Sequence, residues 1–125
     1  MWQNLAWMAV AGALGALTRY GVATALHRLC GTVFPWGTLA VNGLGCFLFG
    51  LVWSATEERI ASSSQVRLIV LTGYLGAFTT FSTYAFETSA LIKETHWMLA
   101  IANGVAQNLL GVACVFLGLA ASRWL

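Results

Sequence analysis

A run rich in glycine, hydroxyl and aromatic residues, placed in the middle of an apolar stretch, constrains this chain more than any other feature. The apolar stretch extends from about Val66 to Ile92, and the run inside it reads Gly73-Tyr74-Leu75-Gly76-Ala77-Phe78-Thr79-Thr80-Phe81-Ser82-Thr83-Tyr84. Irregular, polar backbone is tolerated at membrane depth only where protein buries it or where it lines a water-filled path. The run therefore predicts a broken helix at a functional centre, because transport proteins use such breaks to aim backbone groups at ions.

The composition places that stretch in a membrane protein. The 125 residues are 59% hydrophobic and only 8% charged, with a mean hydropathy of +0.79, whereas soluble domains carry roughly 25% charged residues. We therefore expect an all-α integral membrane protein with about four helices of ~20 residues each and no separate soluble domain. A net charge of +2 is too small and too scattered to indicate nucleic acid as a partner.

We expect neither a cleaved targeting segment nor a cysteine motif for a metal. No Lys or Arg precedes the first apolar run, whose first basic residue is Arg19, so we expect no cleaved signal peptide. The three cysteines, Cys30, Cys46 and Cys114, are odd in number and match no metal spacing. We interpret them as packing residues.

The apolar pattern predicts four membrane-spanning helices in a single domain that covers residues 1–125. The spans are about 5–26, 36–55, 66–92 and 97–122. Tryptophans fall near the predicted span ends at Trp2, Trp7, Trp36, Trp53, Trp97 and Trp124. Indole rings prefer the headgroup region, so this placement supports the boundaries independently of hydropathy.

The basic residues barely distinguish the two faces of the membrane. An even number of spans puts both termini on one face, together with the 56–65 connector. That face carries Arg59, Arg67 and Arg123, and the opposite face carries Arg28 and Lys93. A Lys/Arg excess normally marks the cytoplasmic side, so this chain either inserts in both orientations or relies on a small bias. Insertion both ways would permit an antiparallel, dual-topology homodimer with its two-fold axis in the membrane plane.

A dimer would also resolve the problem that a broken helix poses. A subunit of four helices can hardly surround a pore and also bury its freed backbone groups. Two copies would place their broken segments against each other at the midplane, where the carbonyls could share a cation. Backbone oxygens suit hard cations such as Na⁺.

Polar residues inside the apolar spans each allow two interpretations. Arg19 either attracts an anion at a vestibule or anchors its helix at the interface, and Glu87 either pairs with Arg19 or titrates at a pore mouth. Asn42 carries amide donors into the second span without placing a charge in lipid, and Thr38 lies one turn earlier on the same face. Both are candidates for lining a pore for a small anion. Hydrogen bonding between helices is the alternative for Asn42.

The third and fourth spans carry two further pairs of candidates. Asn103 and Gln107 lie four residues apart on one face of the fourth span, where they either face a pore or bond to another helix. Phe81 and Tyr84 lie three apart after the predicted break. They are either packing residues or a pair whose positive ring edges receive a small anion.

These motifs together closely resemble the Fluc/CrcB fluoride channels. The resemblance covers essentially the whole chain and rests on the segments Gly12–Tyr20, Pro35–Asn42 and, most specifically, Gly73–Tyr84. It implies an antiparallel dual-topology homodimer with two fluoride pores, in a bacterial plasma (inner) membrane. It also implies a buried structural Na⁺ at the dimer centre.

The resemblance carries over to individual residues. It implies that main-chain carbonyls of Gly76 and Thr79 hold the Na⁺. It places the pore-lining residues at Asn42, Phe81, Tyr84, Ser82 and Thr83. This chain departs from the family in having Tyr84 where many members have phenylalanine. It also has Asn103, Gln107 and Gly111 on the fourth-helix face where members often carry serine.

The function that this resemblance implies is passive export of fluoride. Fluoride enters cells as HF, dissociates at the higher internal pH and leaves as F⁻ through the channel, so the protein is not expected to be an enzyme. The chain has no G-x-x-x-x-G-K-[ST] run for ATP. One rival is a small proton-coupled multidrug exporter, which needs a membrane-embedded carboxylate, and Glu87 is the only candidate. The other is a non-transporting assembly factor, which would not need the broken span.

Overall fold

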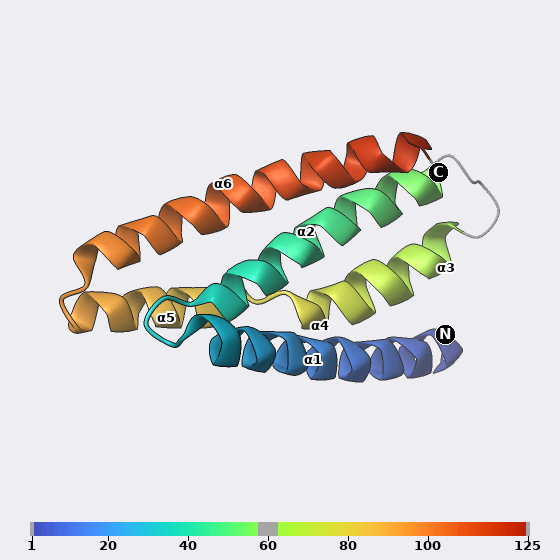
Figure 1. Cartoon of the computed structure of the whole chain (residues 1–125). Coiled ribbons are helices and arrows are strands. Elements are labelled where there is room, and N and C mark those ends of the chain that lie inside the picture. Colours follow the sequence, from blue (N-terminus) through green and yellow to red (C-terminus); the bar gives the residue numbers. More distant parts are fainter. Residues whose placement is uncertain (1, 58–62, 125) are drawn as a thin grey trace.

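The structure, a computed structural model, describes residues 2–57 and 63–124 as a bundle of helices joined by short turns (Figure 1). In chain order the elements are α1 (Trp2–Cys30), α2 (Trp36–Glu57), α3 (Ser63–Arg67), the π-helical η1 (Leu68–Leu75), α4 (Gly76–Phe78), α5 (Phe81–Lys93), α6 (Trp97–Ala121) and the 3-10 turn η2 (Ser122–Trp124). No strand occurs within the described ranges. Arg59, which entered the count of basic residues, lies outside them.

Four segments are long and apolar enough to cross a membrane: Trp2–Cys30, Trp36–Glu57, Ser64–Lys93 and Trp97–Trp124. The prediction of four helices long and apolar enough to span a membrane is therefore confirmed. The N- and C-terminal ends of the chain lie at the same end of the bundle (Figure 1). The first helix extends beyond the predicted 5–26 at both ends. It stops at Gly31, whose φ of 87° and N–H bond to the His27 carbonyl at 3.1 Å form a left-handed cap.

The most extensive helix pair is α2 with α6, and glycines bring their backbones together. A Cβ atom added at Gly50 would overlap the Val115 carbonyl, and one added at Gly118 would overlap the Phe47 carbonyl. Apolar surface gains little from leaving lipid, so helices in membranes associate through such close van der Waals packing. The glycines thereby fix the position of α6 against α2.

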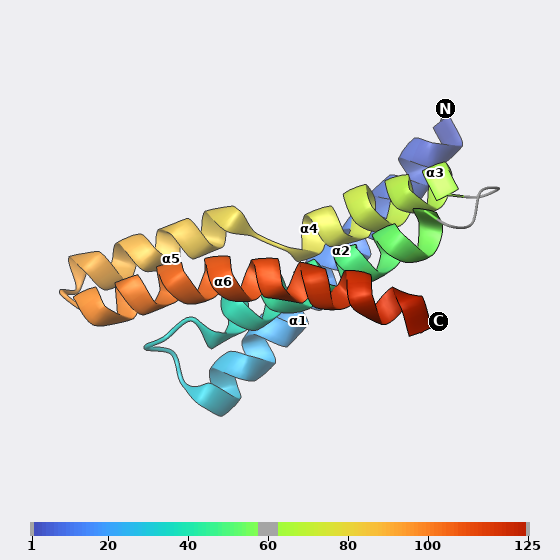
Figure 2. The ribbon, with the colours of Figure 1, turned by 90° about the horizontal axis from the view of Figure 1, so that it is seen from above.

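The third apolar segment packs against different neighbours in its two halves. Its first half, η1 and α4, lies against α1, whereas α5 packs chiefly against α6 (Figures 1 and 2). The first half contributes Leu71, Leu75 and Phe78 to a buried cluster that Val41 of α2 completes. The core of the subunit therefore sits beside the first half.

Extended backbone separates these two halves. Thr79 has φ −78° and ψ 157°, and Thr80 has φ −151° and ψ 111°, so neither residue continues the helix. On the other side of α4, η1 has the wider winding of a π-helix, which is frequent at functional sites. The interruption falls where the segment passes from one packing environment to the other (Figure 2).

Candidate functional site

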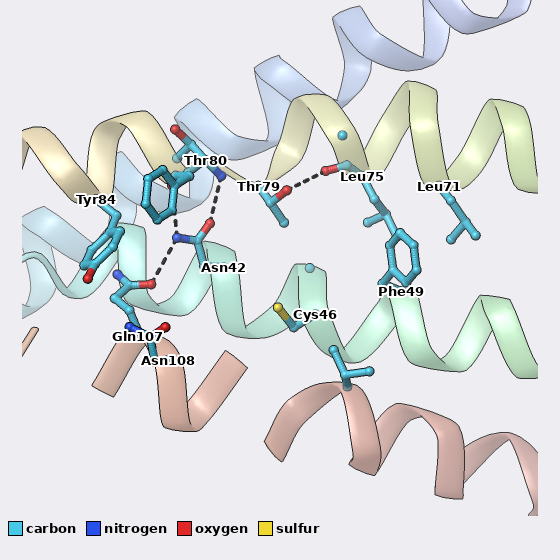
Figure 3. Close-up of a pocket in the computed structure, with 14 residues that line it drawn as sticks. Asn42, Cys46, Phe49, Leu71, Leu75, Thr79, Thr80, Tyr84, Gln107 and Asn108 are labelled. Atoms are coloured by element: carbon cyan, nitrogen blue, oxygen red, sulfur yellow. Dashed lines mark hydrogen bonds between the residues drawn. The ribbon is translucent and has the colours of Figure 1, made fainter. Parts of the chain in front are cut away.

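The side chain of Asn42 replaces the missing helical partners of the Thr80 backbone. Its Oδ1 accepts the Thr80 N–H at 2.8 Å, and its Nδ2 donates to the Thr80 carbonyl at 3.1 Å. Thr80 is buried, and each unsatisfied backbone group away from water costs several kcal/mol. The two bonds from Asn42 therefore allow extended backbone inside an apolar bundle (Figure 3).

A chain of side-chain hydrogen bonds runs from Asn42 to α6 and on to α5. Asn42 Nδ2 donates to Gln107 Oε1 at 3.0 Å, and Gln107 Nε2 faces Asn103 Oδ1 at 3.5 Å. Asn103, which is fully buried, donates from Nδ2 to Thr88 Oγ1 at 2.9 Å. Thr88 Oγ1 in turn donates to the Tyr84 carbonyl at 2.8 Å. The structure thus brings the predicted residues Asn42, Gln107 and Asn103 into one network.

Two side-chain oxygens accept the N–H groups that a continuous helix would direct to the carbonyls of Gly76 and Thr79. In an α-helix the N–H of residue i+4 bonds to the carbonyl of residue i. The Thr80 N–H instead bonds to Asn42 Oδ1, and the Thr83 N–H bonds to Thr80 Oγ1 at 3.2 Å. The carbonyls of Gly76 and Thr79 therefore lose their regular helical donors.

Hydroxyl groups gather where α5 begins. Thr80 Oγ1 donates to Thr83 Oγ1 at 2.9 Å and lies 3.3 Å from Ser82 Oγ. Thr80 is also the N-cap of α5, the position at which a threonine oxygen satisfies a free N–H of the first turn. The predicted Ser82 and Thr83 thus form one polar cluster with Thr80.

Glu87 is hydrogen-bonded to Thr38 and forms no ion pair with Arg19 in the described part of the chain. Thr38 Oγ1 donates to Glu87 Oε1 at 2.8 Å, which joins α2 to α5. Glu87 Oε2 and His27 Nε2 are buried without a partner in the described part of the chain, and both residues line one pocket of about 200 Å³. Arg19 lines a different pocket, of about 250 Å³, with Thr38 and Thr80. No ion pair joins Arg19 to Glu87 among residues 2–57 and 63–124.

Phe81 and Tyr84 form an aromatic pair on the first turn of α5. Their ring centroids lie 5.4 Å apart and the planes meet at 67°, an edge-to-face arrangement. Phe81 is 78% exposed in the subunit. The pair therefore lies at the surface of this subunit instead of filling its core.

Several predicted residues line one open pocket of about 330 Å³ beside the interruption (Figure 3). These residues are Asn42, Gly76, Thr79, Phe81, Tyr84 and Gln107. The predicted residues Arg19, Thr38, Ser82, Thr83, Glu87 and Asn103 lie outside its lining. Asn108, Cys46 and Phe49 also line it. The pocket therefore places the Asn42 network, the aromatic pair and the two carbonyl residues beside one another.

The sequence interpretation missed the roles of Thr80 and Thr88. Thr80 was identifiable in principle, because a threonine three residues before Thr83 at a helix start is an N-cap pattern. Thr88 carries no such signal, because its role depends on Asn103 of another helix. The structure therefore adds two hydroxyl residues to the candidate site.

Comparison with known proteins gives a consistent family match. The family model described as "CrcB-like protein, Camphor Resistance (CrcB)" matches residues 6–119. A protein of Nitrosococcus oceani named fluoride-specific ion channel FluC is 54% identical over 98% of both chains. Proteins with the same name from Solidesulfovibrio magneticus and Maridesulfovibrio salexigens are 46% identical over 98% of both chains and 47% identical over 94% of this chain and 93% of the relative.

Proposed function

Because the chain belongs to the CrcB-like family, we propose that it is a fluoride-selective ion channel that exports F⁻ passively and so reduces fluoride toxicity. The names of its relatives support the choice of ion. Four membrane-capable helices and the family make it a multi-pass protein of a bacterial membrane, for which we propose the plasma (inner) membrane. A channel makes and breaks no covalent bond, so the proposed function is not enzymatic.

The observation that carries the proposal is the polar unit around Thr80 inside the third apolar segment. A helix that only anchored the protein would not need two bonds from Asn42 to hold its backbone open. Non-helical backbone in membrane proteins is tolerated where it is buried or lines a path. We place this unit at mid-membrane depth, as the broken third helix of the channel.

We further propose that two copies assemble as an antiparallel dual-topology homodimer, each copy a single domain of residues 1–125. The exposed Phe81 and the open pocket beside it support a second copy on this face. Gly76 also lines the pocket, and a Cβ atom added there would meet the Leu71 carbonyl oxygen at 3.7 Å as its nearest atom beyond the adjacent turn of helix. Gly76→Leu should therefore leave the subunit folded while weakening the dimer, which cross-linking in liposomes would measure.

The residues present fit a structural Na⁺ held by main-chain oxygens. The carbonyls of Gly76 and Thr79 have lost their helical donors, and both residues line the pocket proposed to face the second copy. Oxygen ligands suit hard cations, and few carboxylates favour a monovalent one. A bound Na⁺ would supply a fixed positive charge between the two copies. Thr79→Ala should retain Na⁺ binding, because the ligand is a backbone atom.

The fluoride path follows the polar side chains that the interruption exposes. Phe81 and Tyr84 would offer positive ring edges, and the hydroxyls of Ser82 and Thr83 would continue the path along α5. Amide and hydroxyl donors in a narrow path would replace water around F⁻ and exclude the larger Cl⁻. We place Arg19 at a vestibule that attracts the anion, and Thr38 and Glu87 at a mouth.

For Asn42 we propose contact with the permeating ion, at the expense of an existing bond. Both hydrogens of its Nδ2 are directed at protein oxygens, one at Thr80 and one at Gln107. An F⁻ that reached Asn42 would therefore compete with one of these oxygens. The Gln107 side chain lines the same pocket, and we place it, with Asn103 behind it, on the α6 side of the path.

A liposome efflux assay tests the proposal against its rivals. Purified protein in liposomes loaded with F⁻ or Cl⁻ should release F⁻ rapidly and Cl⁻ no faster than protein-free liposomes do. Proton-driven efflux of a cationic dye without F⁻ release would favour the multidrug exporter. Release of neither ion nor dye would favour the assembly factor. The names of the relatives and the family match favour the fluoride channel over the exporter.

A further inference from the structure

We propose that Gln107 is a positioning residue that fixes the Asn42 amide and so keeps the Gly76 carbonyl available to a cation. The inference rests on the proposed channel with its shared Na⁺. It goes beyond that proposal because it gives Gln107 a role in building the cation site, whichever part the residue plays in the ion path.

The backbone of Thr80 determines how the Asn42 amide must lie. An N–H group only donates and a carbonyl only accepts, so Oδ1 must face the Thr80 N–H and Nδ2 must face the Thr80 carbonyl. The second hydrogen of Nδ2 then points to Gln107 Oε1 at 3.0 Å. In the rotated orientation Asn42 Oδ1 would face two other oxygens. The Gln107 oxygen therefore selects the same orientation as Thr80 does, from the opposite side.

Gln107 is itself held by the next turn of α6. Its Nε2 faces Asn103 Oδ1, and Asn103 is fully buried and donates to Thr88 of α5. The side-chain amides of Gln107 and Asn103 each accept a hydrogen bond on the oxygen from one neighbour and donate one from the nitrogen to the other. The network therefore has one direction, and its last member before Asn42 is Gln107.

The competing state is a longer helix in which the Thr80 N–H returns to the Gly76 carbonyl. A backbone hydrogen bond is strong where water is absent, so Asn42 must hold the N–H against a real competitor. If Gln107 is removed, Asn42 keeps its two bonds to Thr80 but loses the bond that anchors its Nδ2 to α6. The Gly76 carbonyl would then spend more time bonded to Thr80 and less time free for Na⁺.

The test is the sodium affinity of the purified full-length protein, measured by equilibrium binding of radioactive Na⁺. Gln107→Met removes the polar atoms at similar length and should weaken Na⁺ binding by about fivefold to tenfold, the value of one lost hydrogen bond. Gln107→Glu keeps an oxygen toward Asn42 but sets a carboxylate oxygen against Asn103 Oδ1, so it should recover only part of the affinity lost in Gln107→Met. Asn108→Ala is the matched control, because Asn108 lines the same pocket but bonds to its own helix at Gly104.

Hydrogen exchange at the Thr80 amide supplies a readout that needs neither Na⁺ nor transport. Without Na⁺, the hydrogen-exchange rate of the Thr80 amide in Gln107→Met should differ at least threefold from the rate in the wild type. The rate in Asn108→Ala should equal that of the wild type. Wild-type Na⁺ affinity and wild-type Thr80 exchange in a folded Gln107→Met protein would overturn the inference, as would equal losses in Asn108→Ala. A merely structural role would lower the yield of dimer and leave the affinity of the remaining dimer unaltered.

Failure of the channel proposal has a different signature. A wild-type protein that binds Na⁺ but releases no F⁻ from liposomes would contradict the channel while leaving the role of Gln107 intact. A wild-type protein that conducts F⁻ and binds no Na⁺ would overturn the role of Gln107 and leave the channel standing.

Discussion

The two halves of the third apolar segment differ in how completely the subunit covers them. The first half, η1 and α4, buries Leu71, Gly73 and Leu75 in η1 and Phe78 in α4. The second half, α5, is longer than η1 or α4, yet within it only Leu91 is buried. One half is therefore anchored within the subunit, whereas the other has a side that its own chain does not cover.

The uncovered half is also the polar one. Its hydroxyls partly bond to their own helix, as Ser89 Oγ does to the Ala85 carbonyl at 2.9 Å, and partly to the cluster around Thr80. Aromatic side chains beside them project outward, with Phe81 78% and Phe86 74% exposed. A helix with exposed rings on one side and hydroxyls on another fits a position between lipid, a second copy and an ion path.

The largest expected effect comes from Asn42→Asp, which acts where the two halves meet. The aspartate would keep the acceptor for the Thr80 N–H but lose the donor, and it would bring a carboxylate oxygen against the oxygens of Thr80 and Gln107. We expect F⁻ efflux to fall to the rate of protein-free liposomes while the dimer still assembles. Asn108→Asp places the same charge in the same pocket and should reduce efflux less. Unchanged efflux in a folded Asn42→Asp dimer would make Asn42 a packing residue.

Three lysines added to the 56–65 connector would test whether the uncovered half needs an oppositely oriented partner. The added charge should fix one orientation in the membrane, and efflux should be lost when that chain is expressed alone. Co-expression with a chain carrying three lysines in the opposite connector, residues 93–96, should restore efflux. Full efflux from the singly oriented chain would show that antiparallel pairing is unnecessary.

Phe78→Ala and Phe86→Ala compare the two halves directly. Phe78 is 3% exposed and Phe86 is 74% exposed. Truncating Phe78 leaves a cavity and should lower the free energy of unfolding by about 3 kcal/mol, whereas truncating Phe86 should cost under about 0.5 kcal/mol. Equilibrium unfolding in mixed micelles would measure both. Equal losses would show that the assembled protein covers α5 as fully as the first half.

The smallest effect is expected from Thr80→Val, which removes the N-cap of α5. The variant keeps the size of the side chain but leaves the Thr83 N–H without its acceptor, at a cost of about 1 kcal/mol. Thr80→Ser retains the hydroxyl and should remain within about 0.5 kcal/mol of the wild type. If both variants have the stability of the wild type, the capping bond does not hold the start of α5.

The carboxamide residues of the hydrogen-bond network stood out in the sequence, but their partners did not, and Thr80 and Thr88 were missed. Asn42, Gln107 and Asn103 stood out because carboxamides are costly in apolar spans and need partners. Their choice of partners was open, since each could bond to any facing helix. The same holds for Glu87, for which Arg19 was one suggested partner and which the structure pairs with Thr38. Many pairs of polar residues could form hydrogen bonds, because the sequence does not determine how each helix is rotated about its axis.

The four membrane-capable helices and the polar run in the third follow from the order of apolar and polar residues alone. Lipid offers no backbone hydrogen bonds, so long apolar segments must be helical wherever they cross it. The meeting of Asn42 with Thr80, 38 positions along the chain, depends on how the helices pack. That meeting depends on close packing such as Gly45 against Thr79, where a Cβ atom at Gly45 would overlap the Thr79 side chain. Contacts of this kind set the rotation and depth of each helix, which hydrophobic periodicity alone leaves free.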